Sequence, residues 1–160
     1  ISYLRPELLK AKLFTIVSNV FKEKIVRLEN LMIEKNMWKA VVYTSLWKLT
    51  LYMDLLTGNL RFYDKELPFN GARRLISTRI LQSYGEDVIE YAYIGYSAKY
   101  KDCISVKAKT DRNIFYFLLD KKSGRVVKSD RLELGSILKE LKAKSLRLAI
   151  EKDKPISESD

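Results

Sequence analysis

The sequence WKLTLYMDLLTGNL, residues 47–60, has a counterpart 66 residues later in NIFYFLLDKKSGRV, residues 113–126. Each stretch begins with an apolar strand segment, passes an Asp, and reaches a Gly four residues after that Asp; in residues 47–54 the odd-numbered positions up to Met53 are all apolar. Alternation with a period of two predicts a β-strand that has one face on a core. The common spacing predicts a duplicated unit. The matched apolar positions are Leu49 with Phe115, Leu51 with Phe117, Met53 with Leu119, and Leu60 with Val126.

The Asp and Gly of each stretch predict a tight β-hairpin turn. A carboxylate at the start of such a turn accepts hydrogen bonds from the amides that follow it, and a Gly tolerates the positive φ that the turn requires. Asp54 with Gly58 and Asp120 with Gly124 meet both requirements. A hydroxyl residue precedes each glycine, namely Thr57 and Ser123. This turn chemistry accounts for both aspartates without a metal or an acid–base role.

Both halves of the chain predict a helix followed by antiparallel strands. Apolar spacing predicts a helix that starts at Pro6 and carries apolar residues to Phe21, a second over about 72–84, and a last over about 132–150. Strands are predicted at 37–44, 47–54 and 59–63, and near 88–97, 103–109, 113–119 and 125–128. Residues 24–34 fit either an extension of the first helix or a strand. Their alignment with residues 87–91, which follow Gly85, favours the strand.

The predicted fold class is therefore α+β, with two tandem repeats of a helix plus an antiparallel sheet and a C-terminal helix. The expected boundaries are 1–67 and 68–131 for the repeats, 132–152 for the closing helix, and 153–160 for a polar tail. A repeat of about 65 residues is marginally stable alone. We therefore expect the two repeats to pack together as one globular body.

Each half resembles a PepSY domain, in which a helix and strands end in a hydrophobic strand and a D-A-x-T-G-x-V hairpin. The matching residues are 52–60 and 118–126. Val126 and Val127 occupy the family's valine-rich strand, whereas the first half has Leu60 there, and neither half has the Ala after Asp. The resemblance covers roughly residues 8–130. It implies a cystatin-like fold and a non-catalytic binding or inhibitory role, often outside the cytoplasm.

The composition excludes several classes of enzyme and of metal site. The chain has no His and one cysteine, Cys103, which excludes His-dependent triads, His-ligated zinc, multi-cysteine metal sites and an intrachain disulfide. The glycines form no dinucleotide or Walker pattern. We expect no enzymatic activity, no cofactor and no metal, and we expect Cys103 to be a small buried residue.

Nothing in the sequence fixes the compartment. No apolar run reaches the roughly 18–20 residues that a membrane helix needs. The chain begins with Ile1, so a removed upstream segment is compatible with the sequence, and both a cytoplasmic and an extracytoplasmic location stay open.

The formal net charge of +10 offers an alternative function. Basic residues crowd around the second hairpin, and phosphate backbones bind such patches through counterion release. Solvation of a β-rich surface is the simpler explanation. The candidate ligand-binding residues are Lys121, Lys122, Arg125, Lys128 and Arg131.

Tyrosines suggest a second kind of nucleic-acid surface. Tyr91, Tyr93, Tyr96 and Tyr100 cluster, and simple alternation places Tyr91 and Tyr93 on one strand face, as in a stacking platform for bases. Packing in or beside the core is favoured instead, because aromatic residues are common in strands. The leading prediction is a non-enzymatic module that binds a protein or peptide through a sheet face or a sheet edge. A nucleic-acid-binding protein is the alternative.

Overall fold

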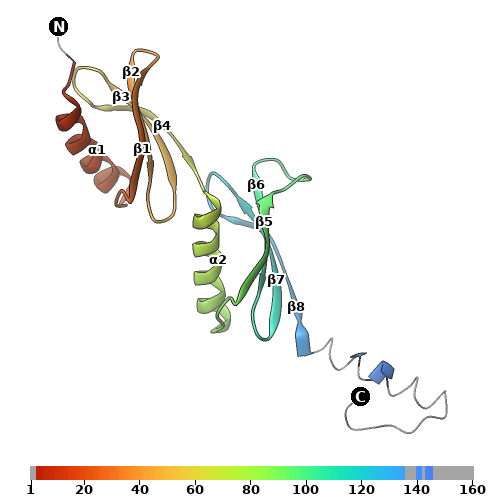
Figure 1. Ribbon diagram of the computed structural model, residues 1–160. Helices are drawn as coiled ribbons and strands as arrows, with labels where there is room; N and C mark the ends of the chain where they lie inside the picture. Colours follow the sequence, from red (N-terminus) through yellow and green to blue (C-terminus); the bar gives the residue numbers. More distant parts are fainter. Residues whose placement is uncertain (1–2, 136–139, 142, 146–160) are drawn as a thin grey trace.

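The computed structural model describes residues 3–135, 140–141 and 143–145, and within them it contains two units of the same architecture (Figure 1). Each unit is one helix followed by a four-stranded antiparallel sheet whose strands are ordered as in the sequence. The predicted α+β duplication is confirmed. The first unit contains α1 (Pro6–Phe21), β1 (Arg27–Glu34), β2 (Met37–Tyr43), β3 (Lys48–Asp54) and β4 (Leu60–Glu66). The second contains α2 (Phe69–Tyr84), β5 (Glu90–Tyr96), β6 (Cys103–Lys109), β7 (Asn113–Asp120) and β8 (Val126–Glu133).

Residues 24–34, whose sequence fits either a helix or a strand, contain strand β1. Helix α1 ends where Lys22 adopts a left-handed conformation with φ 57°, and the Lys22 amide donates to the Val17 carbonyl. This left-handed cap stops the helix. The chain can then turn back and pair β1 with β2.

Helix α2 begins at Phe69, three residues before the predicted start. Pro68 occupies the N-cap position with extended backbone, and its carbonyl accepts the Ala72 amide. The first turn therefore includes Asn70 and Gly71. Both residues have low helix propensity and are not apolar, so the spacing of apolar residues did not indicate that the helix starts here.

Strand β8 is longer than predicted and overlaps the expected closing helix. It runs to Glu133, so residues 132 and 133 pair with β7 and do not begin a helix. The described residues after it, 134–135, 140–141 and 143–145, are helical. The remainder of the predicted closing helix and the tail 153–160 lie outside the described residues.

Each helix covers one face of its own sheet and forms one core with it (Figure 1). The helices match at an offset of 63, with buried Leu9, Leu13 and Val17 of α1 at the positions of Ala72, Ile76 and Ile80 of α2. From β2 and β6 onward the offset is 66. Before β6, the two-residue turn 35–36 of the first unit is replaced by the six-residue loop 97–102. Because β5 is one residue shorter than β1, the net insertion is three residues.

The two units meet where β4 leads into α2. The Leu67 amide donates to the Lys121 carbonyl at 2.6 Å, and the Lys122 amine lies 2.7 Å from an Asp64 carboxylate oxygen. Trp47 packs against the cores of both units. The β7–β8 turn of the second unit is thus fastened to the end of the first sheet.

Candidate functional site: a groove between α2 and β8

The two predicted Asp–Gly turns have the same geometry. Asp54 accepts the amides of Leu56 and Thr57 at 3.0 and 2.9 Å, and Gly58 has a φ of +72°. The second turn repeats these contacts, since Asp120 accepts the amides of Lys122 and Ser123 at 2.8 and 3.0 Å and Gly124 also has a φ of +72°. Asp54, Gly58, Asp120 and Gly124 thus have the contacts and backbone angles of such turns.

These turns make stability depend on pH in acid. Hydrogen bonds from backbone amides, above all those of Thr57 to Asp54 and of Ser123 to Asp120, lower the pKa of both carboxyl groups below the ordinary 3.8. The unfolded chain therefore takes up protons first as the pH falls. We expect the stabilisation by both carboxylates to be complete above about pH 5 and to be lost as the pH falls through 3.8 and below.

The measurement is urea unfolding of Asp54→Asn/Asp120→Asn between pH 3 and 6. This variant should lose less stability on acidification than the unaltered chain. Asp87→Asn, at an exposed carboxylate outside both turns, is the control. An acid dependence in the turn variant equal to that of the unaltered chain would contradict the assignment.

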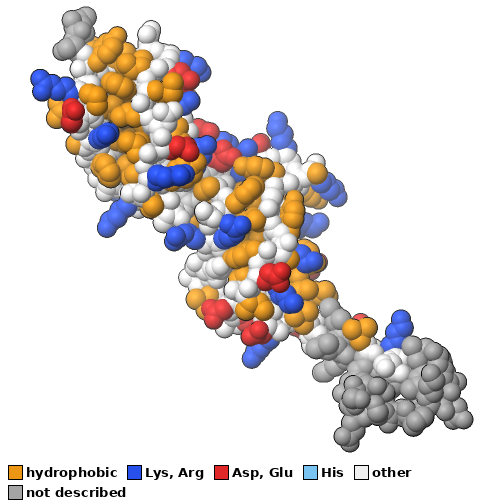
Figure 2. All heavy atoms as spheres, in the orientation of Figure 1, with side chains coloured by type: hydrophobic (Ala, Val, Ile, Leu, Met, Phe, Trp, Pro, Cys, Tyr) orange, Lys and Arg blue, Asp and Glu red, His pale blue; other side chains and the backbone are white. Residues whose placement is uncertain are grey.

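The five candidate basic residues do not form one surface. Lys121 lies 3.7 Å from Glu66 and 3.5 Å from Asp102, and the charge of Glu66 raises the pKa of the Lys121 amine. Lys122 pairs with Asp64. These two lysines therefore fasten the units together and already have acidic partners. Figure 2 shows Lys and Arg side chains spread over the visible face of both units.

The other three candidates point in different directions. Lys128 pairs in register with Leu118, on the sheet face away from α2, whereas Arg131 pairs with Phe115, whose side chain lies in the core beneath α2. Arg131 lies over the Tyr84 ring and 3.2 Å from Glu133. Arg125 lies at the β7–β8 turn beside a separate hollow. This distribution gives a polyanion no single basic face.

The predicted shared face of Tyr91 and Tyr93 is wrong. A β-bulge lies between them, because Tyr91 pairs with Ala108 and Tyr93 with the next residue, Lys107. An extra residue in one strand interrupts the alternation of faces. Tyr91 faces α2, where its hydroxyl donates to the Arg73 carbonyl at 2.7 Å, while Tyr93 is 52% exposed.

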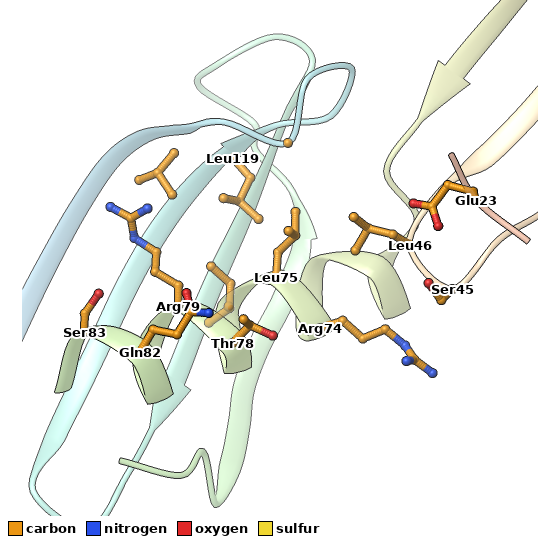
Figure 3. A pocket seen from close by; sticks show the side chains of 13 residues that line it. Glu23, Ser45, Leu46, Arg74, Leu75, Thr78, Arg79, Gln82, Ser83 and Leu119 are labelled. Atoms are coloured by element: carbon orange, nitrogen blue, oxygen red, sulfur yellow. The ribbon is translucent and has the colours of Figure 1, made fainter. Parts of the chain in front are cut away.

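A groove between α2 and the edge strand β8 is the main hollow near the junction. One hollow of about 450 Å³ extends from Leu46 of the first unit along Leu75 and Arg79 of α2 to Val126 (Figure 3). A second, of about 340 Å³, shares Arg79 and Ser83 with it and reaches Tyr84, Ser129 and Arg131. Together they follow β8 along the side that faces α2.

The same groove is closed in the first unit. There the rings of Phe21 and Tyr63 meet edge to face at 4.8 Å, and Ile16 is buried. At the corresponding positions, the second unit has Tyr84 in place of Phe21 and Arg79 in place of Ile16, both at an offset of 63. It has Ser129 in place of Tyr63, at an offset of 66. The small Ser129 and the exposed Arg79 leave the second groove open. Sequence reasoning missed this site, although the Ile16–Arg79 and Tyr63–Ser129 differences were available in the two repeats.

The groove has cationic groups that the protein does not neutralise. Arg74 and Arg79 line it and are exposed, and within the described part of the chain neither guanidinium has an ion pair or a hydrogen bond. Each guanidinium presents five N–H donors that suit a carboxylate. The groove can therefore receive a negatively charged group beside its apolar floor.

The outer edge of β8 offers backbone groups beside the groove. The Leu134 amide donates to the carbonyl of Arg112, which directly precedes β7, so in residues 128–134 the amides of even-numbered residues point toward β7. The amides of Ser129 and Arg131 then point away from the sheet. The Arg131 amide donates to the Asp130 carboxylate at 2.8 Å, which agrees with this direction.

The described residues contain neither an assembled metal site nor an activated thiol. Within 3–135, 140–141 and 143–145, no three side chains of Cys, Asp or Glu are placed to hold a metal ion. Burial raises the pKa of the Cys103 thiol, which disfavours the nucleophilic thiolate. No helix of the described part is long and apolar enough to cross a membrane.

Comparison with known proteins gives one distant structural likeness. No family model matches the chain, and no curated protein matches it in sequence. A solved structure from Clostridium difficile 630, described as a "putative lipoprotein", is 15% identical, and the match covers 77% of this chain and 92% of that one. Its TM-score is 0.31. A likeness at this level assigns the chain neither a family nor a function.

Proposed function

We propose that this chain is a non-enzymatic module that binds an extended segment of a partner protein, which adds as a fifth strand to the edge of β8. The observation that carries the proposal is an exposed edge strand lying along an open groove with two unpaired arginines. The resemblance of both halves to PepSY domains supports a non-catalytic binding role.

Strand addition suits this surface physically. Hydrogen bonds between main chains supply affinity, while hollows for alternate side chains supply specificity. Strand β8 is exposed over seven of its eight residues and carries outward-facing amides. The edge β4 is less suited, because Tyr63 and Phe21 close its groove and its end is fastened to the second unit.

Proline at position 129 tests the proposal. A random peptide library would be selected on the full chain, and the binders re-measured on Ser129→Pro and on Ser129→Ala. Proline removes an outward amide and should spare the pairing of β7 with β8, since proline is tolerated at strand edges. We expect Ser129→Pro to weaken binding about ten-fold or more, because a lost hydrogen bond and the steric block together exceed about 1.4 kcal/mol.

The alanine variant is the matched control, since it removes the hydroxyl and keeps the amide. It should bind within about two-fold of the unaltered chain, and both variants should keep the same thermal midpoint within a few degrees. A library that yields no binder, or binders that tolerate Ser129→Pro, would overturn strand addition at β8.

A further inference from the structure

The edge of β8 also borders a hollow on the opposite face of the sheet. This hollow has a volume of about 280 Å³, and Lys128, Ser129 and Asp130 of β8 contribute to its lining. Its apolar walls come from Tyr100, Tyr116 and Leu118. The same short segment of β8 thus lies between two hollows, one on each face.

The inserted loop builds this second hollow. Loop 97–102 replaces the two-residue turn of the first unit and carries Tyr100 over the outer face. Leu118 is consequently only 7% exposed, although it points away from α2. At the matching position of the first unit, Tyr52 stacks on Phe62 of β4, with ring centroids 4.5 Å apart. In the second unit the residue that corresponds to Phe62 is Lys128, so no ring fills the space beside the edge.

A strand added to β8 would place its side chains alternately in these two hollows. Successive side chains of a strand point to opposite faces of a sheet. Those on the α2 side would meet the guanidinium of Arg79, which has no partner within the described residues. Those on the other side would meet the rings of Tyr100 and Tyr116 and the side chain of Leu118.

The charges at each hollow decide which side chains fit. On the α2 side, the guanidinium groups of Arg79 and Arg74 have no partner within the described residues, Arg131 pairs with Glu133, and Glu23 lines the end of the groove near Leu46. The Asp130 carboxylate borders both hollows and accepts the Arg131 amide. A carboxylate of the ligand would gain charge-assisted hydrogen bonds there. On the outer side, the apolar walls favour a large aliphatic side chain. Lys99 and Lys128 also line this hollow, and the Lys99 amine lies over the Tyr100 ring, 5.3 Å from its centroid.

We propose that the segment recognised at β8 alternates acidic with large apolar residues, the acidic side chains lying against Arg79 and the apolar ones against Tyr116 and Leu118. This inference rests on the proposed strand addition and names its ligand class. We also infer that Asp130 weakens binding of this segment. Its carboxylate accepts the Arg131 amide, which the added strand needs as a donor, and its negative charge repels an acidic ligand.

The test uses three labelled peptides and fluorescence anisotropy with the full chain. The probe is Ser-Leu-Glu-Leu-Glu-Leu-Ser with blocked ends; one comparison peptide has Lys for each Glu, and the other has Ser for each Leu. We expect the probe to bind about ten-fold or more tightly than either comparison peptide. Asp130→Ala should tighten binding of the probe several-fold.

Two variants test which hollow is responsible for the preference for Glu over Lys and which for the preference for Leu over Ser. Arg79→Gln should remove most of the preference for Glu over Lys, while Lys10→Gln, an equal change of charge at an exposed site on α1, should leave it intact. Tyr116→Ser should remove most of the preference for Leu over Ser, while Tyr93→Ser, outside the hollow, should not.

The outcomes separate the two proposals. Equal binding of the three peptides, alongside library binders that are sensitive to Ser129→Pro, would overturn the alternating pattern and leave strand addition standing. Preferences that survive Arg79→Gln and Tyr116→Ser would also overturn it. Absence of any binder sensitive to Ser129→Pro would overturn both.

Discussion

Replacing Gly71 with Ala should destabilise the protein by about 2–3 kcal/mol. A Cβ atom at this position in the first turn of α2 would lie 2.0 Å from the Leu46 carbonyl oxygen and 2.9 Å from Leu67 Cδ1. The first obstacle is backbone, so the units would have to move apart. The same change in an unhindered helix would be stabilising by about 1 kcal/mol, so a loss identifies the contact between the units.

Thermal and urea unfolding of the full chain measure this effect. The midpoint should fall by roughly 5–10 °C. Gly135→Ala is the matched control, because a Cβ at Gly135 meets nothing within 4 Å, and it should be neutral or slightly stabilising. Leu8, which occupies the corresponding position of α1, is 57% exposed, so the constraint belongs to the junction and not to the repeat. A Gly71→Ala midpoint equal to that of the control would show that the two units do not pack closely here.

The fold could be predicted because its signals are local. The Asp–Gly turns depend on a carboxylate and the amides two and three residues later, so residues 54–58 and 120–124 carry their own geometry. The apolar alternation of β3 likewise indicates which face meets the helix, and the matched positions of the repeat carry that assignment to β7. Strand β8 was underestimated because an edge strand exposed on both faces shows no such alternation.

The site could not be predicted in the same way because its contacts join distant residues. Lys121 and Lys122 stand in a basic run, yet their partners Glu66 and Asp64 come from the other unit. Lys128 and Arg131 are three residues apart and lie on opposite faces of one strand. Charge clustering along the sequence therefore overstated charge clustering in space. The useful signal was the difference between the repeats, above all Ile16 against Arg79.

Replacing Gly124 with Val should cost roughly 2–4 kcal/mol, through two separable effects. The backbone has a φ of +72°, which for a residue with a Cβ costs about 1–2 kcal/mol. A Cβ here would also lie 3.1 Å from Leu75 Cδ1 and 3.1 Å from Trp47 Cη2. Because Trp47 packs on both cores, crowding it should loosen the junction as well as the turn.

Gly85→Val separates the two effects. Gly85 caps α2 with a φ of +65°, but a Cβ there meets nothing within 4 Å, so this variant should show the backbone cost alone. We therefore expect urea unfolding to give a larger loss for Gly124→Val than for Gly85→Val. Equal losses would remove Trp47 and Leu75 from the explanation, and an unchanged Gly124→Val would contradict the turn itself. The larger loss follows because position 124 must satisfy the turn of the second hairpin and leave room for Trp47 of the first unit at the same point.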